Sequence, residues 1–176
     1  NSKLTGSPVI AAGDTAVVRN TTHFPHVLSG GDGLLYRNTR QDNDGGTWAA
    51  VSATTVFAAT HTGGALFNLT SGRIGIVAVA TGLKMRIWHQ TNQSYGTVLT
   101  IQSTLAGNYQ WDCVDFSGGT KIACVFITNT GVLQYRSWDG TVLSSATTLA
   151  YPNATKTDKV ALSKMSGNDR IMVYRL

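Results

Sequence analysis

Basic and aromatic residues that could bind a ligand return along the chain at a nearly constant step. Three arginines occupy equivalent places in similar stretches, and a tryptophan follows each of the last two. A guanidinium offers a planar fork of donors, and an indole offers an apolar face with one N–H donor. The alternative is that the arginines pair with Asp and the tryptophans pack inside the protein. The predicted ligand-binding set is Arg37, Arg86, Arg136, Trp48, Trp88 and Trp138.

Residues for catalysis are sparse. The chain contains no Glu, because all nine acidic residues are Asp, and it has no G-x-S-x-G elbow. The commonest carboxylate pair for glycoside hydrolysis is therefore missing, although two Asp could still serve. His23 and His26 are separated by a Pro, and His61 and His89 stand alone, so we expect no convergent zinc ligands. These absences predict a protein that is not an enzyme and uses no metal or cofactor.

An internal repeat would carry these residues. An apolar run, a glycine-bearing turn and an alternating run are most legible at 73–88 and return at 26–37, 121–138 and 169–174. The step of about 48 to 50 residues is typical of solenoids, propellers and arrays. Thr, Val, Ile and aromatic residues favour strands, and only 13% of the residues are charged. The sequence therefore predicts an all-β fold.

The predicted unit contains four short strands, of which the second is apolar on both faces, as a strand between neighbouring sheets is. A four-stranded unit of this length is typical of a propeller blade, so the chain resembles β-propeller proteins, and a two-sheet β-sandwich is the alternative. We expect a flexible leader and one all-β repeat domain of about three and a half units. The leader is 1–8 and the domain 9–176, with units at about 20–64, 65–107 and 108–150 and a half-unit at 156–176.

The half-unit leaves an apolar strand edge at Ile171–Tyr174 that something must cover. One expectation is that Val9–Val18 pairs with this half-unit and closes the ring. Another is that a partner subunit covers it through strand exchange. The third is that the chain is a piece of a larger propeller.

The charge distribution limits the choice of partners. The net charge is +5, but the basic residues are dispersed, and no run of Lys or Arg could follow a phosphate backbone. We therefore expect no nucleic-acid partner, only weak attraction to polyanions such as acidic glycans. No apolar stretch approaches the roughly 20 residues of a membrane span. Because the chain opens on Asn1, we expect a processed or excised segment.

Two stretches resemble motifs of known propeller families. Residues 41–48, Gln-Asp-Asn-Asp-Gly-Gly-Thr-Trp, resemble a degenerate Asp-box of sialidase-type propellers, with Gln41 in place of Ser and Asn43 in place of Asp. In that family the box is a structural turn, and the catalytic Tyr is activated by a Glu that this chain lacks. The strand Met85–Trp88 resembles the I-R-V-Y strand of fucose-binding propellers. There a sugar lies between blades against an Arg and an aromatic ring, with help from a Glu that is absent here. This resemblance implies a glycan ligand.

Cys113 and Cys124 flank a predicted hairpin turn. If Phe116 pairs with Lys121, the cysteines face each other on neighbouring strands, so we expect a disulfide, with two buried free thiols as the alternative. The disulfide indicates an extracellular or surface-exposed location, and glycosylation sequons point the same way. The sequons begin at Asn20, Asn68, Asn92 and Asn153.

These observations predict a non-enzymatic structural or assembly module of a cell or virion surface, which self-associates or belongs to a longer chain. The first alternative is a carbohydrate-binding, lectin-like propeller. The second is a propeller glycan hydrolase, which the missing Glu disfavours.

Overall fold

The computed structural model describes residues 16–20, 23–29, 32–38, 47–57, 61–107, 110–150, 155–165 and 171–175. Every regular element within these ranges is a β-strand, so the predicted all-β class is confirmed. Within these ranges no helix is long and apolar enough to cross a membrane. The predicted leader, the strand candidate Val9–Ala12, residues 41–46 of the Asp-box resemblance and Asn153 lie outside the described residues.

The strands form antiparallel sheets that follow one another in sequence order, which we call blades 1 to 3 and the half-blade. Blade 1 contains β1 (Ala16–Asn20), β2 (His23–Leu28), β3 (Leu35–Asn38) and β4 (Trp48–Ala50). Blade 2 contains β5 (Thr62–Leu69), β6 (Arg73–Val79), β7 (Leu83–His89) and β8 (Ser94–Tyr95), and β9 (Leu99–Gln102) also pairs with β7. Blade 3 contains β10 (Trp111–Phe116), β11 (Lys121–Ile127), β12 (Leu133–Trp138) and β13 (Thr147–Thr148). The half-blade contains β14 (Val160–Lys164) and β15 (Ile171–Arg175).

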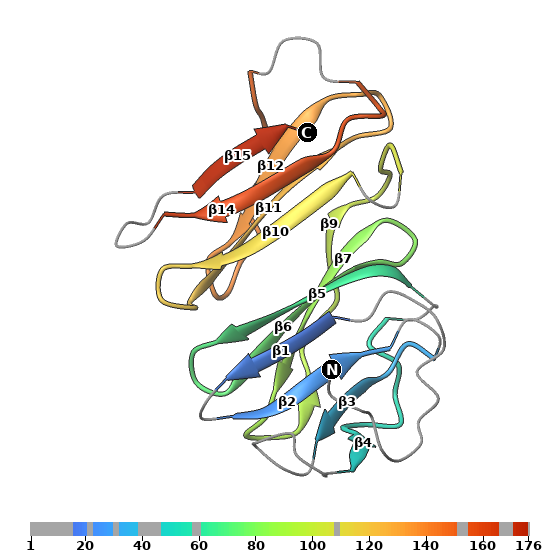
Figure 1. Ribbon diagram of the computed structural model, residues 1–176, viewed down its shortest axis with the longest axis vertical. Helices are drawn as coiled ribbons and strands as arrows, with labels where there is room; N and C mark the ends of the chain where they lie inside the picture. Colours follow the sequence, from blue (N-terminus) through green and yellow to red (C-terminus); the bar gives the residue numbers. More distant parts are fainter. Residues whose placement is uncertain are drawn as a thin grey trace.

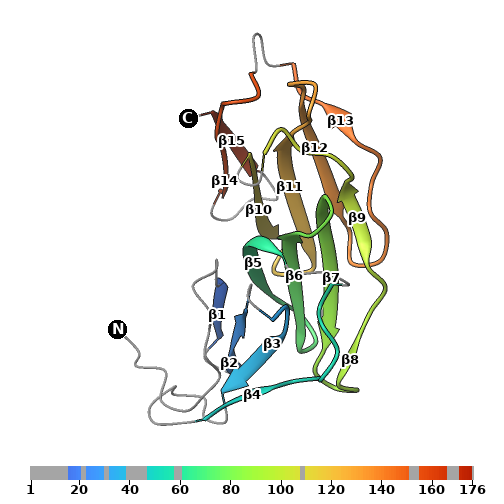
Figure 2. The same ribbon diagram turned by 90° about the vertical axis from the view of Figure 1, so that its right-hand side faces the viewer.

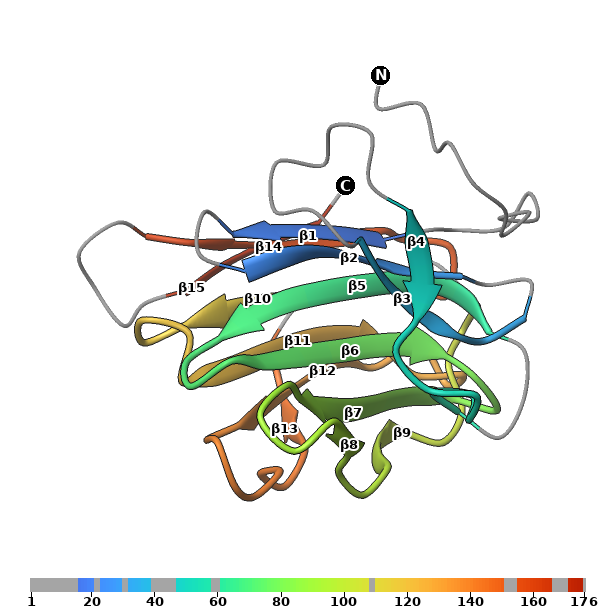
Figure 3. The same ribbon diagram turned by 90° about the horizontal axis from the view of Figure 1, so that it is seen from below.

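The blades are stacked along the long axis of the molecule, with blade 1 at the bottom and the half-blade at the top (Figures 1 and 2). Their first strands are neighbours: β1 contacts β5, β5 contacts β10, and β10 contacts β14. These first strands gather on one side of the molecule, and β8, β9 and β13 lie on the opposite side (Figure 3). This is the arrangement of propeller blades around an axis.

One expectation about closure is wrong. Strand β1 pairs with β2 through Val17–Val27 and Val18–His26, so residues 16–18 form the first strand of blade 1 and do not complete the half-blade. Among the described residues, the first strand of blade 1 is Ala16–Asn20 and the first strand of blade 2 is Thr62–Leu69. The last hairpin forms as predicted between β14 and β15.

The middle strand of blade 2 is buried on both faces, as the repeat predicted. Ile74 and Ile76 face blade 1, where they pack with Leu28 and Leu35. Val77 faces blade 3 and belongs to a cluster with residues of β7, β10 and β11. Because successive side chains of a strand point to opposite faces, one apolar strand serves two inter-blade cores.

The disulfide prediction is confirmed. Phe116 pairs with Lys121 in the β10–β11 hairpin, which places Cys113 directly opposite Cys124, and the two sulfurs are bonded. Both cysteines are buried in the cluster between blades 2 and 3. The bridge therefore holds together the first two strands of blade 3.

Candidate functional site

A pocket of about 110 Å³ lies between blades 1 and 2. It is the place where residues of the predicted ligand-binding set from different blades converge, since Arg37 comes from β3 and Trp88 from β7. Small apolar residues after and within β4 form one wall, and two amide side chains after β7 form another. Among the described residues the lining consists of Arg37, Ala49, Ala50, Val51, Trp88, Gln90 and Gln93.

Trp88 is more deeply buried than its place on an alternating strand predicted, with an exposed fraction of only 3%. The rings of Trp88 and Tyr95 meet edge to face with their centroids 4.6 Å apart. The guanidinium carbon of Arg86 lies over the Tyr95 ring, 4.6 Å from its centroid. Burial raises the pKa of Tyr95 to about 12, so its phenol stays neutral. The stack fixes the indole at the pocket and leaves it little freedom to move.

The sequence analysis missed Gln90 and Gln93. Both belong to the turn between β7 and β8, which separates Trp88 from its partner Tyr95. The corresponding turn of blade 3 is shorter, because Trp138 pairs with Leu143 after Asp139–Val142. Gln93 has a φ of 49°, a left-handed conformation that is uncommon for residues other than Gly, Asn and Asp. The sequence signal that could have located these two residues is a turn that differs between the repeats. Features shared by all repeats serve the fold, whereas a feature of one repeat can serve binding.

Arg86 and Arg136 are held by backbone carbonyls at equivalent inter-blade positions. Nε of Arg86 donates to Gly96 O at 2.8 Å, and Nη1 donates to Val56 O at 2.7 Å and Thr55 O at 3.3 Å.

Arg136 repeats the pattern one blade later. Its Nε donates to Ser144 O at 2.7 Å, and its Nη1 donates to Ile101 O at 2.9 Å and Thr100 O at 3.1 Å. Both arginines therefore connect their own blade to the preceding one. Neither lines the pocket of Arg37.

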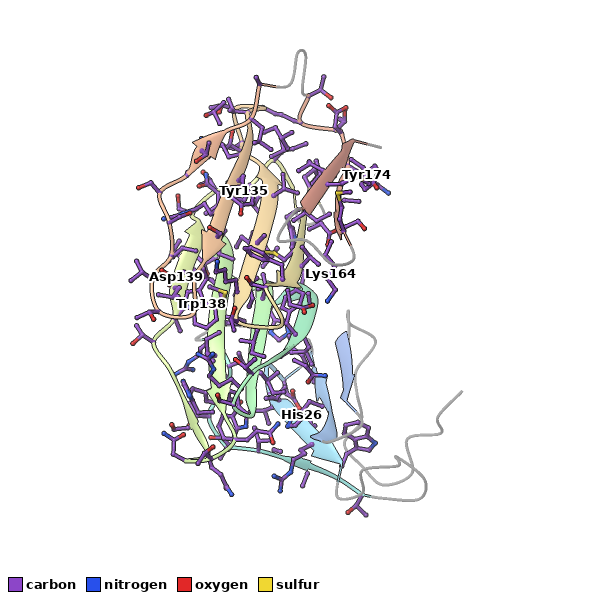
Figure 4. The ribbon with its side chains drawn as sticks, turned by 90° about the vertical axis from the view of Figure 1, so that its left-hand side faces the viewer. His26, Tyr135, Trp138, Asp139, Lys164 and Tyr174 are labelled. Carbon is purple, nitrogen blue, oxygen red and sulfur yellow. A yellow bond between two sulfur atoms is a disulfide. The ribbon has the colours of Figure 1, made fainter. Side chains whose placement is uncertain are left out.

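The remaining tryptophans of the predicted set are also buried. Trp138 ends β12 next to Asp139 (Figure 4). It is 4% exposed, and the guanidinium of Arg73 from blade 2 lies over its ring, 5.5 Å from the centroid. Trp48 is 7% exposed and packs with Tyr36 and Leu34 in blade 1. The structure thus places Trp48 and Trp138 in packing contacts and brings only Trp88 to the pocket.

A second group of polar residues lies in blade 1 and at the start of blade 2. The phenol of Tyr36 donates to Asp32 Oδ2 at 2.6 Å, and the backbone N–H of Leu34 donates to Oδ1 at 3.0 Å. Although burial opposes them, these hydrogen bonds lower the pKa of Asp32, while burial and the bond to Asp32 raise the pKa of Tyr36 to about 12. Burial lowers the pKa of His61, against the attraction of the Asp32 charge. The group favours a neutral imidazole and an ionised carboxylate.

Metal ligands do not converge in the part of the chain that the structure describes, where no three His, Cys or Asp side chains form a cluster that could hold an ion. Of the sequons, Asn92 is exposed in the β7–β8 turn, and its Oδ1 accepts a hydrogen bond from Ser94 at 2.8 Å. Asn68 is half-buried in β5, and Asn20 ends β1.

No protein-family model matches the chain, and no curated protein matches it. Several solved structures match the chain in fold. The catalytic domain of a GH62 α-L-arabinofuranosidase from Coprinopsis cinerea is 12% identical over 96% of this chain and 63% of its own, with a TM-score of 0.53. A variant of AofleA from Arthrobotrys oligospora, in which three arginines are replaced by alanine, is 12% identical over 94% of this chain and 51% of its own, with a TM-score of 0.60. A NanB sialidase from Streptococcus pneumoniae is 14% identical over 85% of this chain and 23% of its own, with a TM-score of 0.53.

The chain therefore spans less than two thirds of the length of each of these three proteins. At these identities the likeness shows the fold alone, which is a β fold also used by carbohydrate-active proteins. It contradicts the prediction that the chain is not an enzyme, because catalytic domains of arabinofuranosidases have this fold. The prediction was wrong because it inferred inactivity from missing residue types and motifs, whereas catalytic domains with this fold exist.

Proposed function

We propose that this protein is a carbohydrate-active β-propeller that binds a saccharide in the pocket between blades 1 and 2. The observation that carries the proposal is the convergence of Arg37 and Trp88, from different blades, on one pocket with the amides of Gln90 and Gln93. Guanidinium and amide groups can hydrogen-bond sugar hydroxyls, and the wall at Ala49 offers an apolar surface, a combination typical of ligand sites. The fold shared with GH62 and sialidase proteins supports the choice of a saccharide.

A glycan array followed by calorimetric titration tests this proposal. Gln93 is exposed, so Gln93→Ala removes a pocket amide without disturbing the core. Its affinity for the best glycan should fall by about two- to tenfold, as expected for the loss of a neutral hydrogen bond. Gln134→Ala, a matched change on β12 of blade 3, should bind like the unaltered protein. Binding of no glycan would refute the proposal, and unchanged binding by Gln93→Ala would place the saccharide elsewhere.

Glycoside hydrolysis is the second candidate, favoured by the fold shared with catalytic domains. Asp32 is the carboxylate that we would assign to a nucleophilic role, because hydrogen bonds from Tyr36 and Leu34 favour its ionised form. Release of nitrophenol from aryl arabinofuranosides and aryl sialosides would measure the activity. No turnover by the unaltered protein would remove this candidate, and turnover that survives Asp32→Asn would show that another group does the chemistry.

We also propose that the half-blade is completed by another strand, from a second subunit or from a longer chain. Among the described strands β15 pairs only with β14, and Met172 and Tyr174 on it are exposed. An unpaired apolar strand edge tends to find a partner. Size-exclusion chromatography with light scattering tests the first option, since a strictly monomeric mass at high concentration would rule out completion between subunits.

The disulfide further supports an extracellular or surface location, because such bonds persist in oxidising compartments. Thiol labelling of the protein taken directly from its source would test this. Quantitative labelling of Cys113 and Cys124 before reduction would contradict the proposed location.

A further inference from the structure

The turn between β7 and β8 presents the sequon of Asn92 to solvent. Residues 91–94 are all exposed, and the turn leads into β8, on the side of the molecule opposite the first strands of the blades (Figure 3). Asn-Gln-Ser at 92–94 has the residue types that an acceptor for N-linked glycans requires. A glycan is bulky and needs such a surface turn, where it displaces no packed side chain.

The side chains of this sequon hold each other in place. The hydroxyl of Ser94 donates to Oδ1 of Asn92 at 2.8 Å, a local bond of the kind that Asn and Ser side chains make in turns. The nitrogen Nδ2 of Asn92, which would carry the glycan, donates to none of the described residues. A glycan on Nδ2 therefore interrupts none of the hydrogen bonds that hold these residues.

Asn68 begins the same motif but lies within the packed part of the sheet. It is half-buried in β5 and pairs with Ile74 of β6, which is 1% exposed. Because side chains alternate along a strand, Asn68 shares a face of β5 with Leu66, which packs in the core between blades 1 and 2. The N–H of Thr70, the hydroxyl residue of this motif, donates to Gly119 O of blade 3 at 2.9 Å. A glycan on Asn68 would therefore press on the contacts between blades.

We propose that Asn92 accepts an N-linked glycan and that Asn68 does not. Nδ2 of Asn92 attacks the anomeric carbon of an oligosaccharide that is carried on a lipid diphosphate. A bond forms between this nitrogen and the anomeric carbon, while the bond from that carbon to the diphosphate oxygen breaks. The diphosphate leaves with the electron pair, and the nitrogen loses one proton. The glycan then begins one residue away from Gln93, which lines the pocket between blades 1 and 2.

Mapping of occupied sites by mass spectrometry tests the inference on the full chain, secreted from eukaryotic cells behind an added signal peptide. Enzymatic release of N-linked glycans in heavy-oxygen water converts each occupied Asn into a labelled Asp, which identifies the site. We expect the label at Asn92 and none at Asn68. A secreted protein that lacks the label at Asn92, or that carries it at Asn68, overturns the inference.

Variants assign the glycan to the motif. Asn92→Gln should lower the mass of the secreted protein by one glycan, and Ser94→Ala should do the same although Asn92 remains. Ser94→Thr keeps a hydroxyl and should keep the glycan. Asn129→Gln is the matched control and should leave the mass of the glycan unchanged, because Asn129 is exposed in the β11–β12 turn and has Gly131 in place of the hydroxyl residue. A glycan that persists in both Asn92→Gln and Ser94→Ala overturns the assignment.

This inference rests on the proposed extracellular location, which can fail separately. The added signal peptide brings the chain to the glycan donor whatever its natural location, so the mapping tests the acceptor site alone. Reactive cysteines in protein taken from its source, together with an occupied Asn92 in the secreted protein, contradict the location and support the acceptor site. Oxidised cysteines together with an unoccupied Asn92 support the location and overturn the acceptor site.

Discussion

Arg86 and Arg136 make the same three hydrogen bonds one blade apart. In each case Nε donates to a carbonyl oxygen of the arginine's own blade, and Nη1 donates to two consecutive carbonyl oxygens of the preceding blade. The consecutive carbonyls belong to Thr55 and Val56 in one case and to Thr100 and Ile101 in the other. The recurrence of the arginines at a constant step is therefore explained by blade-to-blade connection.

Replacing Arg136 should loosen blade 3 from blade 2. Arg136→Lys keeps the charge but cannot reproduce the fork, and Arg136→Ala leaves carbonyl oxygens to be solvated. We expect either change to lower the free energy of unfolding by about 1 to 3 kcal/mol, measured by urea denaturation. Lys156→Ala, at an exposed lysine, serves as the control and should change it by less than about 0.5 kcal/mol. Equal stability of the Arg136 and control variants would show that the guanidinium bonds are no stronger than hydration.

Reduction of the disulfide should destabilise blade 3. The bridge joins residues 11 positions apart. Loop closure of this length is worth about 3 kcal/mol in the chain-entropy model, and the β10–β11 hairpin already limits the loop, so we expect a loss of about 2 to 3 kcal/mol. Urea denaturation with and without reductant measures it. The double variant Cys113→Ser and Cys124→Ser should be equally weak under both conditions, and a reductant effect that persists in it would contradict the assignment.

The sequence was sufficient for the repeat, the strand order and the disulfide because these depend on local patterns. The step between Arg37, Arg86 and Arg136 located equivalent strands, and the turn at Ser117–Thr120 set the register that brings the cysteines together. The continuous apolar sequence of β6 also indicated that both faces of this strand are buried. Each of these signals is contained in a few consecutive residues.

Neither the pocket nor the inter-blade hydrogen bonds of the arginines could be predicted, because both depend on how the blades pack against each other. Arg86 donates hydrogen bonds to main-chain carbonyl oxygens of blade 1. Because every residue has such an oxygen, the sequence does not indicate which residues accept these bonds. Trp88 is buried in a cluster with residues of blade 1, among them Leu28 and Leu35, which are distant from it in the sequence. The role of β1 was misjudged because a short apolar strand pairs equally well, on sequence grounds, with either of two edges.

Gly75 sets how closely blades 2 and 3 approach. A Cβ at this position would lie 2.5 Å from Cδ1 of Ile122 and 3.3 Å from Cδ1 of Leu69. Gly75→Ala should therefore lower the free energy of unfolding by about 1 to 3 kcal/mol through overpacking. Ile122→Val removes the methyl group that is nearest to the new Cβ and alone should cost about 0.5 to 1.5 kcal/mol. In a double-mutant cycle the combined variant should lose less than the sum of the two, and strict additivity would contradict this packing account.

His61 should make the stability of the protein depend on pH. The side chain is 4% exposed, and burial lowers its pKa in the folded protein below the ordinary value of 6.5, while the nearby Asp32 charge opposes the shift. The unfolded chain then binds a proton more readily than the folded one, so the stabilisation is complete above pH 6.5 and is lost as the pH falls toward the lowered pKa. Within that window the free energy of unfolding should fall by up to about 1.4 kcal/mol per pH unit.

Urea denaturation between pH 5 and pH 8 measures this dependence, and His61→Gln should flatten the curve below pH 6.5. His89→Gln, at a half-buried histidine that ends β7, is the matched control and should keep the slope of the unaltered protein. An acid-induced loss of stability that is the same in His61→Gln as in the unaltered protein would assign it to other groups. A flat curve in the unaltered protein would show that the folded structure takes up the proton at His61 as easily as the unfolded chain does.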